Sequence, residues 1–191
     1  MNENKLKIIQ DGLAWIMRNQ AELPPSQIYC ETRDVFKARL DRLIPELQKA
    51  KQSDSKSFLL SAVAGEIGNN SFDHNLGHWR DLAGVYFSFD LTRHCIVLAD
   101  RGQGILSTIK KVRPEISNAS EALRIAFTEK ISGRAPEQRG NGLKFVRRVI
   151  AEQGWELYFY SGNASFVIKE KKEFFQEEKD NILGVLAIIK F

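Results

Sequence analysis

Polar residues in one segment of the sequence recur at the spacing of a single helix face. Glu66 and Asn70 are four residues apart, and Asn69, Asp73 and His74 fall on the same stripe. Asparagine is a poor helix former, so two adjacent asparagines indicate a function beyond helix stability. The amide oxygen of Asn70 is a ligand type that suits Mg²⁺, and Glu66 could act as a general base toward an attacking water or hydroxyl. The alternative is a solvated helix face without a chemical role.

A carboxylate stands at the end of an apolar run. Asp100 follows residues 95–99 and precedes Gly102 and Gly104. Desolvating a carboxylate at the end of a buried strand is costly unless a donor meets it, and the amino group of adenine is one such donor. The two glycines let the backbone turn sharply and approach a ring closely. A plain tight turn can carry the same pattern, so both interpretations stay open for this segment alone.

A glycine loop precedes the last predicted helix. The run Arg139-Gly140-Asn141-Gly142-Leu143 opens a helix whose first amide groups can bind phosphate oxygens. Arg134 and Arg139 lie in the loop and could reach the same negative charge. The three segments together predict a nucleotide pocket, with Glu66 as the catalytic base and Asn70 as the metal ligand. The residues expected to bind the nucleotide are Asn70, Asp100, Gly102, Gly104, Arg134, Arg139, Gly140, Asn141, Gly142 and Leu143.

Hydrophobic periodicity predicts the elements that would position these residues. Helices are expected at 32–51, 57–73 and 143–153, with partial helical character at 119–127. Strands are expected at 84–90 and 95–99, then a hairpin of 155–160 with 164–169, a charged loop at 170–180 and a last strand at 182–191. Residues 5–19 fit either a strand or a helix. Helices grouped between strand hairpins predict an α+β two-layer sandwich with one sheet face covered. The buried stripe of the second helix is expected to be Leu60, Val63, Ala64, Ile67 and Ser71.

Composition is typical of one globular domain. The chain has 191 residues, 43% of them hydrophobic, and a formal net charge of +4 that favours a solvated surface over a nucleic-acid stripe. Cys30 and Cys95 show no metal-ligand spacing, which indicates reduced thiols. No apolar stretch is long enough to cross a membrane, and the first residues lack the apolar core of a signal peptide. We therefore expect a cytoplasmic protein, with residues 1–29 as an N-terminal extension packed on a domain of residues 30–191.

The three segments resemble the N box and the two glycine boxes of the GHKL superfamily of ATPases. The matching residues are Glu66-x-x-x-Asn70, Asp100-x-Gly102-x-Gly104 and Gly140-x-Gly142, and Asn141-Gly142-Leu143 followed by Val146-Arg147-Arg148 is similar to the kinase and anti-sigma-factor branch. The resemblance implies a Bergerat-type fold: a mixed sheet with helices on one face and an ATP lid at about residues 106–139. It also implies ATP and Mg²⁺ as cofactors, with Asn70 on Mg²⁺ and Asp100 on the adenine amino group.

One departure from the family affects the expected activity. Members of the kinase branch often carry Lys three residues after the metal-binding Asn, where this sequence has Asp73. The sequence also shows no phosphoacceptor helix, sensor or transducer domain. We therefore expect a free-standing ATP-binding domain in signalling that hydrolyses ATP or phosphorylates a separate protein partner, and that could form a homodimer.

Two other classes of function are open on sequence grounds. A non-catalytic module would bind ATP or ADP and regulate a partner by closing its lid. A nucleic-acid binder would use Lys110, Lys111 and Arg113, but these residues lack interleaved aromatic side chains, so nucleic acid is not expected as a partner. A membrane is not expected as a partner either.

Overall fold

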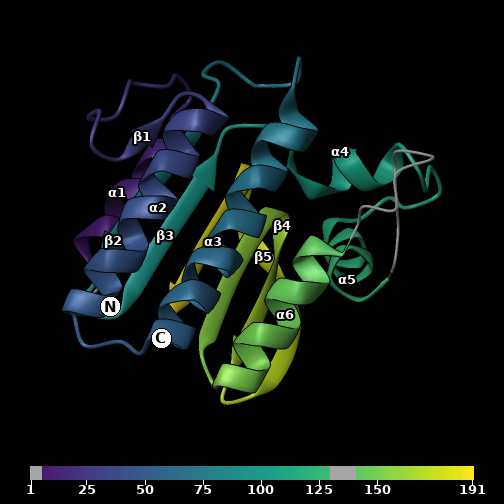
Figure 1. Cartoon of the computed structure of the whole chain (residues 1–191). Coiled ribbons are helices and arrows are strands. Elements are labelled where there is room, and N and C mark those ends of the chain that lie inside the picture. The colour runs from purple at the N-terminus through teal and green to yellow at the C-terminus, as the bar shows by residue number, and fades with distance from the viewer. Residues whose placement is uncertain (1–5, 130–140) are drawn as a thin grey trace.

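The computed structural model describes residues 6–129 and 141–191, which form six helices and five strands (Figure 1). Thr32 and Ser53 cap the two long helices by accepting from the amides of Val35 and Lys56. The elements in chain order are α1 (Lys7–Met17), β1 (Tyr29–Cys30), α2 (Arg33–Lys49), α3 (Asp54–Asn75), β2 (Val85–Asp90), β3 (Cys95–Asp100), α4 (Gly104–Lys110), α5 (Ala119–Thr128), α6 (Gly142–Gln153), β4 (Glu156–Lys169) and β5 (Lys172–Lys190).

The strands form one sheet in the order β1-β2-β3-β5-β4. Every neighbouring pair among the described strands is antiparallel, so the expectation of a mixed sheet was wrong. The reason lies in the strand order: β3 and β4 run in the same direction, but β5 lies between them. The α+β class, with a layer of helices on a sheet, is confirmed.

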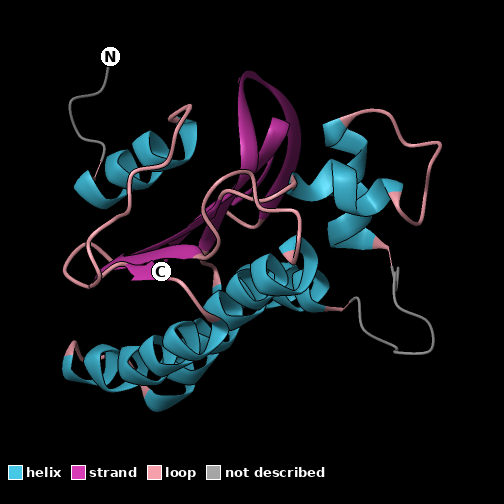
Figure 2. Ribbon diagram, turned by 90° about the horizontal axis from the view of Figure 1, so that it is seen from above, coloured by secondary structure: helices cyan, strands magenta, loops and turns pink. Residues whose placement is uncertain are grey.

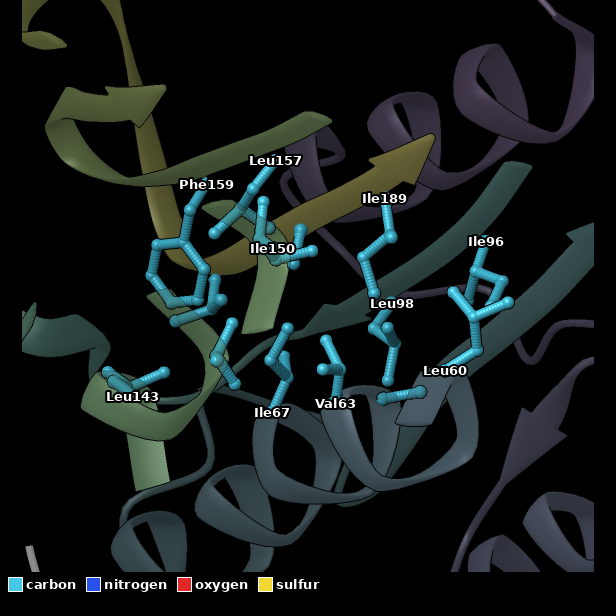
Figure 3. Close-up of a cluster of buried hydrophobic side chains, with 14 of the residues drawn as sticks. Leu60, Val63, Ile67, Ile96, Leu98, Leu143, Ile150, Leu157, Phe159 and Ile189 are labelled. Carbon is cyan, nitrogen blue, oxygen red and sulfur yellow. The ribbon is translucent and has the colours of Figure 1, made fainter. Parts of the chain in front are cut away.

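The main helical layer consists of α2, α3 and α6 on one face of the sheet (Figure 2). All five residues of the stripe predicted for α3 are buried. Figure 3 shows Leu60, Val63 and Ile67 of α3 directed toward Leu98 and Ile189 of the sheet. These contacts hold α3 against the end of β3, which is where the predicted site residues meet.

A second apolar layer covers the opposite face of the sheet. The pattern at 5–19 left strand and helix open, and the structure forms α1 there, with Trp15 and Ile16 packed on Tyr86, Val97 and Leu186. The central strands are apolar on both sides, since all six residues of β3 are buried. The expectation that helices lie on one face only was therefore wrong, because the second apolar face needs a cover as well.

The C-terminal hairpin differs from the one that the sequence suggested. Residues 155–169 were expected to turn at 161–163, and 170–180 to be a loop, but β4 runs through this region and the chain turns at Glu170 and Lys171. Both residues have positive φ angles, 52° and 61°, as a tight two-residue hairpin turn requires. Gly162, with φ of 64°, instead marks a bulge where the pairing register shifts.

Helices α4 and α5 occupy the described part of the predicted lid. The helical character expected at 119–127 is confirmed by α5. The two helices and the loop between them pack together through Ile109, Ile116, Ala122 and Ile125, and α5 also lies against β4. Within residues 6–129 and 141–191, no helix combines the length and apolar character needed to cross a bilayer.

Candidate functional site

A pocket lies between α3, the end of β3, the start of α4 and the first residues of α6. Its space is about 350 Å³, part of it open to solvent. Apolar and polar groups share its lining, as expected of a site that binds a ring and orients it. The lining residues are Ile67, Asn70, Ser71, His74, Asn75, Asp100, Gly104, Ile105, Thr108, Leu143, Phe159 and Val185.

Asp100 supplies a fully buried carboxylate to this pocket. Its Oδ2 accepts from Ser71 Oγ at 2.7 Å, and its Oδ1 accepts from Asn75 Nδ2 at 3.2 Å and from the amide of Gly102 at 2.9 Å. Burial raises the pKa of Asp100 above its ordinary value, and the hydrogen bonds from Ser71, Gly102 and Asn75 oppose that shift only in part. The partners are neutral, so ionising this carboxylate is costly in the folded protein.

Ser71 and Asn75 are site residues that the sequence analysis missed. Asn75 lies on α3 one turn after Ser71, and its Oδ1 accepts from the amide of Gln103 at 3.1 Å. A Cβ at position 102 would lie 2.0 Å from Asn75 Cγ, so only glycine allows the turn to approach α3 this closely. The signal was present in the sequence: the buried stripe of α3 continues from Ile67 into two polar residues, and buried polar groups need partners.

The turn after Asp100 is also held from the side of the β4–β5 hairpin. Gly104 has a φ of 75°, and the amide of Ile105 donates to Ser161 Oγ at 2.9 Å. Ser161 in turn donates to the carbonyl of Gly184 at 2.8 Å. A Cβ on Gly184 would lie 2.0 Å from the carbonyl oxygen of Asp100. The sequence analysis missed Ser161 and Gly184, although an isolated glycine inside an apolar strand can signal close backbone approach.

The N-terminus of α6 meets the polar stripe of α3. A Cβ on Gly142 would lie 2.4 Å from Glu66 Oε2 and 3.7 Å from Asn70 Nδ2, so these two side chains converge on the first turn of α6. Asn141 is the exposed N-cap residue of α6 and makes no side-chain hydrogen bond there. The first amides of α6 therefore lie beside a carboxylate and an amide group, so an anion bound at these amides would also be close to the negative charge of Glu66.

The structure brings most of the predicted site residues together. Asn70, Asp100, Gly104 and Leu143 line this pocket, and Glu66 and Gly142 meet beside it. Gly102 lies behind the pocket against Asn75. Three further predicted residues lie outside the described residues: Arg134, Arg139 and Gly140.

The residue that departs from the kinase-branch pattern has a cationic neighbour. The guanidinium of Arg33, at the start of α2, donates to the carboxylate of Asp73. Over residues 6–129 and 141–191, no group of three or more His, Cys, Asp or Glu side chains is placed to hold a metal ion. A cation at Asn70 would therefore need further oxygen ligands from a bound substrate or from water.

No protein-family model matches this chain, and a search of curated proteins found no relative.

Proposed function

We propose that this protein is an ATP-binding domain of the GHKL type, with a Bergerat-type fold, that binds Mg²⁺ and ATP in the pocket between α3, β3 and α6. The observation that carries the proposal is Asp100, a buried carboxylate held by neutral donors at the wall of a pocket. A carboxylate with a pKa raised by burial, placed in a pocket, is typical of a functional site. If Asp100 had only a structural role, Asn could form hydrogen bonds at this position without the free-energy cost of burying a carboxylate.

The pocket suits an adenine ring better than a guanine ring. Adenine carries an exocyclic amino group that donates a hydrogen bond to Asp100, whereas guanine presents a carbonyl oxygen at the equivalent ring position. Ile105, Leu143 and Val185 provide apolar walls for the ring. The proposal therefore includes selectivity for ATP over GTP, because a carbonyl oxygen facing the buried carboxylate would be left without a donor.

The phosphate groups belong at the N-terminus of α6. Its first amides are uncapped by Asn141, and Gly142 lets Glu66 and Asn70 of α3 approach them closely. Glu66 already places a carboxylate at this point, so phosphate oxygens need a cation between them. The donors present fit Mg²⁺: Asn70 offers one amide oxygen, and phosphate oxygens and water would complete its shell. Bound Mg²⁺ would neutralise phosphate charge.

Glu66 is the proposed general base. Its carboxylate takes the proton of a water molecule, or of a hydroxyl group on a partner protein, as that oxygen attacks the γ-phosphorus and the bond to the ADP oxygen breaks. Water as the nucleophile gives ATP hydrolysis, and a protein hydroxyl gives a phosphorylated partner. Without either reaction the protein would be a nucleotide-dependent binding module.

Calorimetric titration of the full chain with ATP, with and without Mg²⁺, tests the proposal. ATP is expected to bind more tightly with Mg²⁺, and GTP to compete poorly. Asn70→Ala is expected to remove the Mg²⁺-dependent part of the affinity while leaving metal-free ADP binding nearly unchanged. Asn69→Ala is the matched control, because it removes the neighbouring amide, which does not line the pocket. Failure of the wild-type chain to bind ATP would refute the proposal.

A further inference from the structure

The residue directly after Asp100 sends its side chain to the other face of the sheet. Arg101 is fully buried. Its Nε donates to Asp81 Oδ1 at 2.8 Å and its Nη2 donates to Asp81 Oδ2 at 2.6 Å, a two-pronged ion pair. The carboxylate of Asp81 also accepts from the amides of Ala21 and Leu82, so the pair is tied to two loops at once.

The same guanidinium closes the C-terminal end of α1. Its Nη1 donates to the carbonyls of Trp15 at 2.5 Å and Ile16 at 3.2 Å, and its Nη2 donates to the carbonyl of Arg18 at 2.8 Å. The last carbonyls of a helix have no donors within the helix, so Arg101 satisfies groups that would otherwise need water. With the two bonds to Asp81, all five N–H groups of the guanidinium are used.

A guanidinium with every donor satisfied has little freedom to shift, and its main chain lies inside the nucleotide turn. The carbonyl of Arg101 accepts from the amide of Arg80 at 2.8 Å, and the next amide, that of Gly102, donates to Asp100. One residue thus belongs to two structures. Its backbone forms the turn at the pocket, and its side chain joins Asp81 and the end of α1, a group of residues that we call the Arg101 cluster.

We propose that Arg101 is a positioning residue for nucleotide binding and that, through the Arg101 cluster, docking of α1 on the sheet and nucleotide binding at Asp100 stabilise each other. The inference rests on the proposed function. Linkage of this kind is reciprocal: a change that breaks the Arg101 cluster weakens the nucleotide complex, and bound nucleotide makes the end of α1 more rigid. A purely structural role for Arg101 would lower stability and leave the affinity of the folded protein unchanged.

Arg80 provides a matched control within the chain. Its Nη2 donates to the carbonyls of Ile16 and Arg18, at 3.1 Å and 3.0 Å, so it contacts the same end of α1. Its side chain, however, does not start from the turn that carries Asp100. Arg80→Lys should weaken two bonds to the end of α1 but keep the Arg101 cluster that joins α1 to the turn. Arg101→Lys should break the cluster itself, because an ammonium group cannot reproduce the planar fork of donors.

The test compares Arg101→Lys, Arg80→Lys and wild type as full chains, at a temperature where circular dichroism shows all three folded. Calorimetry with Mg-ATP is expected to give a Kd raised about 5- to 150-fold for Arg101→Lys, the usual range of coupling between sites. For Arg80→Lys we expect a change of about twofold or less, because the Arg101 cluster is kept in this variant. Hydrogen exchange at the amides of residues 14–18 is expected to slow with Mg-ATP in wild type and in Arg80→Lys, but not in Arg101→Lys.

Each result decides the inference. If wild type fails to bind ATP, the proposed function is wrong and the inference falls with it. If wild type binds and Arg101→Lys binds equally well, or if both arginine variants lose the same affinity, the inference alone is wrong. Should Arg101→Lys not fold, Asp81→Asn replaces it, since that variant keeps Arg101 and removes its charged partner. It is then expected to weaken Mg-ATP binding at least several-fold, and an unchanged Kd would overturn the inference.

Discussion

Asp81 and Asp100 lie on opposite sides of Arg101, and their carboxylates have different surroundings and oppositely shifted pKa values. Asp100, on the pocket side, is 2% exposed and held by neutral donors, and burial raises its pKa. Asp81, on the α1 side, has a side chain that is 26% exposed and pairs with Arg101, whose hydrogen bonds lower the pKa of Asp81 to about 2. Desolvation decides the pKa of one carboxyl group, and a cation decides that of the other.

This difference indicates that the carboxylate of Asp100 serves binding and that the carboxylate of Asp81 stabilises the fold. An ion pair with two parallel hydrogen bonds favours the charged form of Asp81, and so its ionisation favours the folded state. Ionisation of Asp100 opposes folding, because the carboxylate is buried and none of the groups bonded to it carries a positive charge. We therefore expect substitutions on the pocket side to change binding and turnover with little loss of stability. Substitutions on the α1 side should lower stability, and should change binding only where they break the Arg101 cluster.

The largest expected effect belongs to Glu66, the second carboxylate of the pocket side. Glu66→Gln should lower ATP turnover or phosphotransfer about 10²- to 10⁴-fold, the usual contribution of a general base, while Mg-ATP affinity and stability are retained. A steady-state phosphate-release assay measures this. Glu152→Gln on the exposed side of α6 is the control for loss of one negative charge. Full turnover in Glu66→Gln would assign the base to another group.

The next largest effect concerns Asp100. Asp100→Asn should weaken ATP binding about tenfold to over a hundredfold, because a charge-assisted hydrogen bond contributes roughly 1.5–3 kcal/mol. The free energy of unfolding should stay equal or rise, since Asn can keep the bonds to Gly102 and Ser71 without a buried charge. Calorimetry and urea denaturation provide the two measurements. Asp90→Asn, at the end of the neighbouring strand β2, is the control. If Asp100→Asn lost stability but kept its affinity for ATP, the pocket side would not differ from the α1 side in the way proposed.

Removal of the carboxylate on the other face should act on folding. Asp81→Ala leaves the buried guanidinium of Arg101 without its charged partner, and breaking a buried ion pair in this way costs several kcal/mol. We expect a loss of about 3 kcal/mol in the free energy of unfolding, at the low end because Asp81 is partly exposed. Urea denaturation at pH 7 measures the free energy of unfolding of Asp81→Ala, with Asp100→Asn measured in parallel for comparison. A stability equal to that of wild type would mean that water replaces the carboxylate without penalty.

The smallest effect is a difference in pH dependence between these variants. The pKa of Asp81 is lowered from 3.8 to about 2, so its contribution to stability is present above pH 3.8 and is lost as pH falls through about 2. The pKa of Asp100 is raised above 3.8, so wild type should lose stability relative to Asp100→Asn as pH rises above 3.8. Urea denaturation from pH 2 to pH 7 should therefore give two difference curves of opposite slope, and curves of equal slope would contradict the two pKa directions.

Much of the pocket side could be predicted from the sequence. Local periodicity predicts several of its elements, since apolar residues repeat at helical or strand spacing. These are the stripe of α3 that includes Leu60 and Ile67, strands β2 and β3, and helix α6. The end of β3 placed Asp100 at the edge of the core, and the glycines after it marked a turn. Ser71 and Asn75 could also have been found, because polar residues on a buried stripe require partners.

The sheet and the α1 side could not be predicted in the same way. The glycine at 162 suggested a turn, yet long-range pairing of β4 with β5 made it a bulge and moved the turn to Glu170 and Lys171. Which strands become neighbours depends on contacts across the whole chain, and so the sheet came out antiparallel with helices on both faces.

Sequence by itself determined which residues alternate, which helix faces are apolar and where a carboxylate ends a strand, because these are properties of a few consecutive residues. Only the tertiary structure decided what each carboxylate meets. Glu66 reaches Gly142 across the gap between two helices, and Arg101 bonds to carbonyls of α1 that lie more than eighty residues earlier in the chain. The free energies of such contacts depend on burial and on the distance between groups, and both are set only when the whole sheet and its two helical covers have packed together.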